Sequence, residues 1–163
     1  HVTGVQTCAL PISYPRPITG LEGKFSLHYP IAAAVLDGRC VLSTFTDKSV
    51  LRPEIAAIYD RIDAAEHESS RGDDPLFETR SSGSRGFVVV EVRTKDGRNE
   101  QIRIDKPPGS PQRELSWDDL KQKFLDCAEH SGHVGPQAAG KAFTAITKLE
   151  QIEDIAQVTA YLR

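Results

Sequence analysis

The 163-residue sequence contains no methionine, a single tryptophan and only 3 cysteines. Its formal net charge is −3, so it lacks the basic excess that marks a nucleic-acid-binding surface. It also lacks any apolar run approaching the roughly 20 residues that a membrane-spanning helix needs. We therefore expect no nucleic-acid partner and no membrane partner. The length is sufficient for one substantial hydrophobic core.

Cysteine is too scarce for a disulfide framework, because Cys8 belongs to a doubtful N-terminal segment and only Cys40 and Cys127 remain. A reducing, cytoplasmic location is the expectation. Cys127, His130 and His133 are spaced at threes, which could suggest zinc. A glycine interrupts the run and no fourth ligand is evident. The sequence therefore predicts no metal site.

The N-terminal segment, residues 1–13, does not begin with methionine. The run VTGVQTCALPI within it resembles the translation of a common sequencing-library adapter. It has neither the basic start nor the long apolar run of a signal peptide. We predict an artefactual or disordered segment; the alternative is a natural tail or short strand.

The first half of the remaining chain indicates helices. Glycines and prolines in residues 14–23 favour an extended loop. Residues 27–36 follow as a helix that Gly38 ends. A second helix begins near Pro53 and carries an apolar face that extends to Ile62. Beyond it, residues 64–86 predict a loop of low order, with one short strand near Leu76 and Phe77 as an open alternative.

The second half begins with strands and ends with helices. The valine-rich residues 87–94 predict a strand, Asp96-Gly97 a turn, and residues 101–104 the returning strand. Ser116 is a helix N-cap, and a final helical region covers residues 137–162 in two pieces. The fold class is therefore α+β: a small antiparallel sheet with flanking helices, followed by C-terminal helices.

The segment at residues 19–38 concentrates polar groups at a helix entrance, where backbone N–H groups favour anions. Together with Phe45-Thr46-Asp47, Pro108-Gly109-Ser110-Pro111 and the run LSWDDLKQKF at 115–124, it resembles the MmgE/PrpD family. That resemblance implies that residues 14–112 form part of an α/β lid domain. Residues 113–163 would be C-terminal helices of an all-helical domain, and the chain a C-terminal fragment of a homodimeric enzyme.

The resemblance also implies a chemistry, because the family includes 2-methylcitrate dehydratases, cis-aconitate decarboxylases and iminodisuccinate epimerases. We therefore expect the chain to be a fragment of a lyase or isomerase that needs no cofactor. It would move a proton next to a carboxylate of a small di- or tricarboxylic acid. Dehydration, decarboxylation and epimerisation remain open. The alternative is a catalytically inactive structural or interaction module.

Four residues of the 19–38 segment are candidates for the site. The resemblance implies that Tyr29 reaches the active-site cleft, and Tyr29 and Lys24 are the expected catalytic residues. Ser26 and His28 are the expected substrate-binding residues. Each residue has an alternative role outside the site. Tyr29 could be a core tyrosine whose hydroxyl is hydrogen-bonded, and Lys24 a solvated surface lysine. Ser26 could be the helix N-cap, and His28 could lie at the surface.

Overall fold

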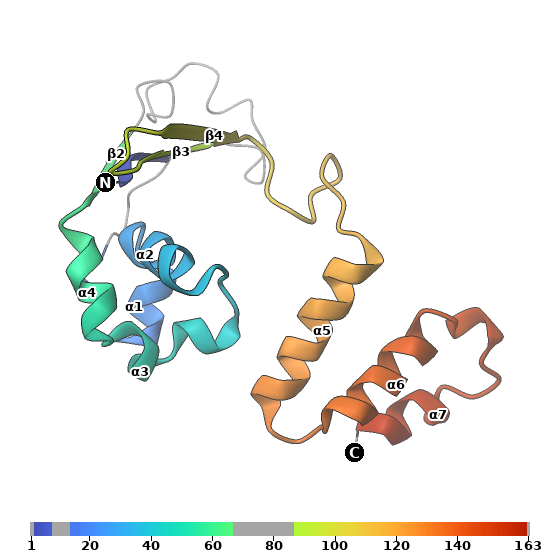
Figure 1. Ribbon diagram of the computed structural model, residues 1–163. Helices are drawn as coiled ribbons and strands as arrows, with labels where there is room; N and C mark the ends of the chain where they lie inside the picture. The colour runs from blue at the N-terminus through green and yellow to red at the C-terminus, as the bar shows by residue number, and fades with distance from the viewer. Residues whose placement is uncertain (1, 8–13, 67–86, 163) are drawn as a thin grey trace. The chain divides into compact units, whose positions relative to one another are not determined.

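The computed structural model describes residues 2–7, 14–66 and 87–162 of the chain. The chain divides into two compact units, His1–Arg113 and Glu114–Arg163, and the division falls one residue beyond the expected 112/113 boundary. Figure 1 shows the sheet and helices α1 to α4 in the first unit and helices α5 to α7 in the second. None of the described helices is long and apolar enough to cross a membrane.

The sheet of the first unit has four strands in the order β2-β1-β3-β4. The strands are β1 (Val2–Thr7), β2 (Ile62–Glu66), β3 (Val88–Arg93) and β4 (Asn99–Ile104). The β3–β4 hairpin is antiparallel as expected, and its turn contains Gly97 with φ of 89°. Strand β1 pairs antiparallel with β3 but parallel with β2. The α+β class is confirmed, and the parallel pair is an addition that the sequence did not reveal.

The N-terminal segment differs from the expectation of a disordered tail, because Val2–Thr7 form strand β1 inside the sheet. Both neighbours of β1 come from far along the chain, so no local pattern announces the pairing. The adapter origin of residues 1–13 stays a prediction. Residues 8–13 lie outside the described part, as do residues 67–86, which include the possible strand near Leu76.

Helix α1 (Gly20–Lys24) overlaps the extended loop expected over residues 14–23, so that prediction is wrong for residues 20–23. Two local contacts explain the helix. The Thr19 hydroxyl accepts a hydrogen bond from the Glu22 backbone N–H (3.1 Å), and the Glu22 carboxylate accepts one from the Ile18 N–H (2.7 Å). These contacts satisfy N–H groups that a helix start leaves unpaired.

Helix α2 (His28–Asp37) matches the expected helix, and Gly38 ends it with φ of 73°. The Gly38 backbone N–H donates a hydrogen bond to the Ala34 carbonyl oxygen at 2.9 Å. A short 3₁₀ turn (Leu42–Phe45), helix α3 (Asp47–Val50) and helix α4 (Pro53–Tyr59) follow. Pro53 begins α4 as expected, but the helix ends at Tyr59 and Ile62 opens β2 instead of extending the helical face.

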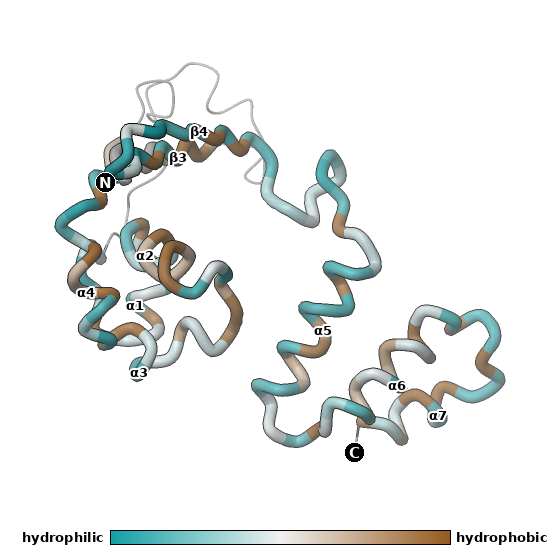
Figure 2. Tube along the Cα trace, viewed as in Figure 1, coloured by the Kyte–Doolittle hydropathy of each residue, from teal (hydrophilic) through white to brown (hydrophobic). Residues whose placement is uncertain are grey.

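The core of the first unit joins α2 and α4 to the sheet. Its buried members are Tyr29, Ala32, Ala33, Val50, Ile55, Tyr59 and Ile62. The alternate valines of β3 pack against them, because a strand sends every second side chain to the same face. Figure 2 shows α2 as mostly apolar, in keeping with this central position. Full burial of a side chain such as Ile55 contributes about 1.5–3 kcal/mol.

The second unit consists of helices α5 (Trp117–Ser131), α6 (Pro136–Ile146) and α7 (Ala156–Thr159) with 3₁₀ turns at Leu149–Gln151 and Ala160–Leu162. Ser116 caps α5 as expected, and Gly132 ends it with φ of 69°. The ring of Phe143 lies between those of Trp117 and Phe124, at centroid distances of 6.3 and 5.6 Å.

The apolar side of the second unit is only partly covered. Helix α5 has no buried residue, and Figure 2 shows it as a mixture of polar and apolar positions. The side chains of Trp117 and Ile155 are 62% and 59% exposed. A small core of Ala139, Ala142, Phe143 and Val158 holds the unit together.

Candidate functional site

The first turn of α2 carries the candidate residues His28 and Tyr29 side by side in the sequence. Successive helical residues point about 100° apart, so the two side chains enter different surroundings. Tyr29 enters the core of the first unit, and His28 lines a surface depression. The site therefore has two parts that share one helix.

Tyr29 is fully buried, and its hydroxyl donates a hydrogen bond to the backbone carbonyl oxygen of Thr44. Its ring meets that of Phe45 edge to face at 5.8 Å. Gly23 allows this packing, because a Cβ there would lie 3.0 Å from Cδ1 of Tyr29. This geometry matches the alternative of a core tyrosine with a satisfied hydroxyl. The catalytic role of Tyr29 stays a prediction.

Two charged side chains, those of Arg52 and Asp37, influence the phenol of Tyr29. Burial raises the pKa of Tyr29, and the nearby Arg52 guanidinium partly offsets that rise. Arg52 forms a bidentate ion pair with Asp37, with N–O distances of 2.9 and 2.6 Å. This ion pair lowers the pKa of the Asp37 carboxyl. The phenol therefore stays protonated at neutral pH, in the form that donates a hydrogen bond or a proton.

Ser26 is buried, and its hydroxyl oxygen accepts a hydrogen bond from the Tyr29 backbone N–H at 3.0 Å. It thus holds the entrance of α2 in the manner of the N-cap alternative, although the residue directly before the helix is Leu27. Direct substrate binding by Ser26 stays a prediction.

Lys24 is exposed at the last residue of α1, whereas the sequence placed it at a helix entrance. A cation there interacts favourably with the C-terminal end of the helix. The structure places Lys24 in the same segment as Ser26 and, within the described residues, shows no hydrogen bond or ion pair of its ammonium with Tyr29 or His28. Its predicted catalytic role depends on a substrate bringing an anion to this surface.

His28 lines a depression of about 320 Å³ together with Pro15, Arg16, Tyr59, Asp60, Ile62 and Asp63. Within the described part of the chain, the buried Nδ1 atom of His28 has no hydrogen-bond partner, and neither has the buried hydroxyl of Tyr59. Burial lowers the pKa of His28, and the Asp63 carboxylate partly opposes that shift. Burial also raises the pKa of Tyr59 to about 12. A neutral imidazole and a neutral phenol therefore line the same depression.

Arg16 borders the same depression. Its guanidinium pairs with the Asp60 carboxylate and lies 5.7 Å from the centre of the Tyr59 ring. The sequence placed Tyr59 on an apolar helix face but did not single out Arg16, Asp63 or Arg52. No local signal could have found them, because their contacts join residues that the chain path brings together.

Metal binding finds no support in the described part of the chain, where no three His, Cys, Asp or Glu side chains gather closely enough to hold an ion. Cys127, His130 and His133 lie in this part, on α5 and just beyond its end. The chemistry that the described residues offer is hydrogen bonding, charge pairing and proton transfer.

Comparison with known proteins agrees with the resemblance. The chain is 26% identical over 152 residues to a protein named cis-aconitate decarboxylase from Mus musculus, and 24% identical to the protein of that name from Homo sapiens. Each comparison covers 93% of this chain and 29% of the relative, so the chain spans less than a third of their length. The family model of the MmgE/PrpD C-terminal domain matches residues 2–151. The chain therefore belongs to the MmgE/PrpD family.

Proposed function

We propose that the chain is the C-terminal part of a cofactor-independent lyase or isomerase that acts on a small di- or tricarboxylic acid. The observation that carries the proposal is the family match over residues 2–151. Two relatives that bear the name cis-aconitate decarboxylase support a carboxylic acid substrate. The proposed reaction moves a proton beside a carboxylate, with loss of water, loss of CO₂ or epimerisation following.

In this reaction, negative charge spreads onto carboxylate oxygens, and preorganised donors stabilise it. We assign Tyr29 the role of proton donor, because its phenol is neutral and held in one direction. To donate a proton to the substrate, the Tyr29 hydroxyl must break its hydrogen bond with the Thr44 carbonyl oxygen and form one with a substrate group. Lys24 would supply a counter-charge for a substrate carboxylate.

His28 and Ser26 are the proposed substrate-binding residues. The position of His28 in the lining of the depression supports its assignment, since a neutral imidazole can hydrogen-bond a substrate hydroxyl. Ser26 would act mainly indirectly, because its hydroxyl accepts a hydrogen bond from the Tyr29 backbone N–H and so stabilises the first turn of α2. We further propose a cytoplasmic, homodimeric parent enzyme with no metal or organic cofactor.

The experiment that tests this function uses the complete gene. The intact enzyme is incubated in D₂O with 2-methylcitrate, cis-aconitate and iminodisuccinate, and each acid is followed by proton NMR. We expect deuterium incorporation beside a carboxylate, or loss of water or CO₂, with one of them. Absence of exchange with every acid would contradict the proposed reaction while leaving the family membership intact.

A second candidate is that the 163-residue chain by itself is an inactive structural or interaction module. The exposed side chains of Trp117 and Ile155 favour it, because such apolar surface normally packs against another element. We expect no turnover from the purified chain, and self-association in light scattering. A monodisperse monomer with measurable turnover would overturn this candidate.

A further inference from the structure

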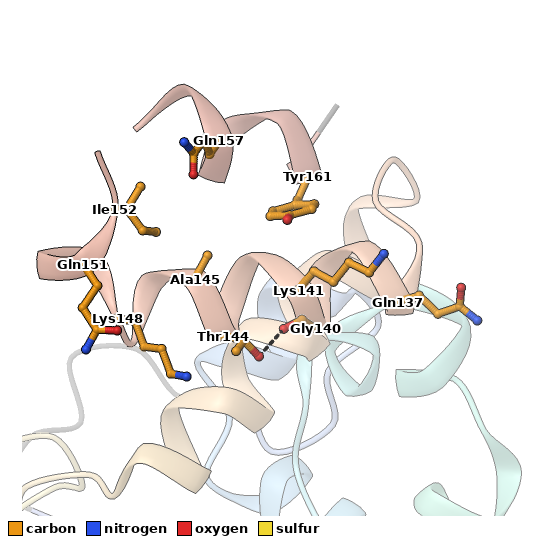
Figure 3. A pocket seen from close by; sticks show the side chains of 10 residues that line it. All are labelled: Gln137, Gly140, Lys141, Thr144, Ala145, Lys148, Gln151, Ile152, Gln157 and Tyr161. Atoms are coloured by element: carbon orange, nitrogen blue, oxygen red, sulfur yellow. Dashed lines mark hydrogen bonds between the residues drawn. The ribbon is translucent and has the colours of Figure 1, made fainter. Parts of the chain in front are cut away.

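The second unit contains a cavity of about 740 Å³ that the catalytic proposal does not use. Helix α6 forms one wall, and Figure 3 shows Ile152, Gln157 and Tyr161 facing that helix across the opening. The remaining lining residues are Gln137, Gly140, Lys141, Thr144, Ala145, Lys148 and Gln151. Its volume is in the range of small-molecule sites.

The charge of this cavity has one sign. Lys141 and Lys148 line it, and no aspartate or glutamate does. Within the residues that the structure describes, neither ammonium forms an ion pair with a carboxylate. Asp154 lies in the neighbouring turn, but its carboxylate accepts a hydrogen bond from the Ala156 N–H (2.8 Å) at the start of α7. The charged side chains that line the cavity are therefore both cationic, although Glu150, Glu153 and Asp154 lie in the adjoining segment between α6 and α7.

Lys141 lies on α6, whereas Lys148 lies two residues beyond the end of that helix, directly before the 3₁₀ turn Leu149–Gln151. Figure 3 shows the two lysine side chains at separate points along the cavity. Each ammonium is a point charge on a flexible four-carbon stem, so both can turn toward one ligand. The spacing favours a ligand with two or more separated negative groups over a single small anion.

Neutral donors complete the lining. The amide groups of Gln151 and Gln157 and the hydroxyl of Tyr161 can donate to oxygen atoms. The Thr144 hydroxyl is already committed, since it donates to the Gly140 carbonyl oxygen at 2.9 Å. Carboxylate oxygens only accept hydrogen bonds at neutral pH, so they match the two lysine ammonium groups and the N–H groups of the glutamine amides.

We propose that the cavity between α6 and the α7 region binds a small multivalent anion of the di- or tricarboxylate class through Lys141 and Lys148. The site lies in the second unit and is distinct from the Tyr29 and His28 surroundings in the first. The proposal does not depend on the proposed reaction, because binding here requires no turnover.

Isothermal titration calorimetry on the full 163-residue chain tests this site, with citrate as the probe. We expect saturable binding at low ionic strength that weakens as salt is added. Lys141→Gln/Lys148→Gln should lower the affinity at least about tenfold, because each charge-assisted contact is lost. The matched control is Lys121→Gln/Lys123→Gln, which removes two lysines of α5 that do not line the cavity and should change the affinity less than about twofold.

Further probes define the anion. Acetate tests the need for more than one negative group, and pyrophosphate separates a phosphate preference from a carboxylate preference. Tighter binding of citrate than of acetate and pyrophosphate supports the proposal. No saturable citrate binding, equal losses in both double variants, or preference for pyrophosphate would overturn it. Circular dichroism checks that every variant remains folded, and none of these outcomes bears on deuterium exchange by the complete enzyme.

Discussion

The hydroxyl of Tyr29 donates a hydrogen bond to the backbone carbonyl oxygen of Thr44, and both residues are buried. The bond ties the first turn of α2 to the 3₁₀ turn that precedes α3. It gives the phenol a structural role that is independent of chemistry. Any test of Tyr29 in catalysis must therefore measure folding and turnover separately.

The Tyr29→Phe variant of the complete enzyme should lose at least about tenfold in turnover, because a positioned proton donor is removed. It should also lose roughly 1 kcal/mol of unfolding free energy with the Thr44 hydrogen bond. Steady-state kinetics and urea unfolding measure the two effects. Tyr14→Phe, at an exposed position, is the matched control. Reduced stability with near wild-type turnover would remove Tyr29 from the site and leave it a core residue.

Gly20→Ala should destabilise the first unit by more than about 2 kcal/mol, because the new Cβ would lie 2.0 Å from the Phe45 carbonyl oxygen. The backbone there must shift, and the Phe45 ring packs on Tyr29. Gly38→Ala is the comparison: it meets no neighbour but has φ of 73°, so about 1 kcal/mol is expected. Urea unfolding measures both. Equal losses would show that the close approach of α1 to Phe45 is not rigid.

His28 should make the first unit less stable in mild acid. Burial lowers its pKa in the folded state, whereas the unfolded chain has a histidine pKa near ~6.5. As the pH falls below that value, the unfolded state binds the proton first, so the unfolding free energy decreases until the folded-state pKa is passed. The Arg16 charge acts in the same direction as burial, and Asp63 opposes it.

Urea unfolding between about pH 5 and pH 7.5 measures this dependence. His28→Gln should flatten it, and His130→Gln, at an exposed position near the end of α5, should not. An unchanged slope in His28→Gln would mean that other groups cause the pH dependence.

Ser116→Ala should weaken the start of α5. The Ser116 hydroxyl accepts a hydrogen bond from the Asp119 N–H at 3.1 Å, and the Asp119 carboxylate accepts one from the Ser116 N–H at 3.0 Å. Loss of such a cap costs about 1 kcal/mol. Thermal unfolding followed by circular dichroism measures it. Ser116→Asn keeps an oxygen that can cap and should stay near wild type; if it fell as far as alanine, the cap would not be the cause.

The sheet order bears on the origin of the N-terminal segment. Strand β1 lies between β2 and β3, so both of these strands use it as a partner. We predict that the gene recovered from source DNA encodes a different strand-forming sequence in place of residues 1–13. Long-read sequencing across this position is the measurement. Recovery of the printed residues would show that the adapter interpretation is wrong and that the segment is native.

Local sequence signals determined several elements of this protein. Helix α2 with Gly38 at its end, the β3–β4 hairpin around Gly97, and the Ser116 cap of α5 were all predictable. Each rests on residues within a few positions of one another, where capping, turn geometry and side-chain periodicity act directly. The same signals carried the family resemblance that the comparison confirmed.

Only the tertiary structure decided how distant residues meet. It placed β1 between β2 and β3, paired Arg52 with Asp37, and separated buried Tyr29 from His28 in its polar depression. It also gathered α6 and the α7 region around a cavity lined by lysines. These contacts depend on the path of the chain rather than on local pattern, since a side chain's surroundings are set by whichever segments fold against it.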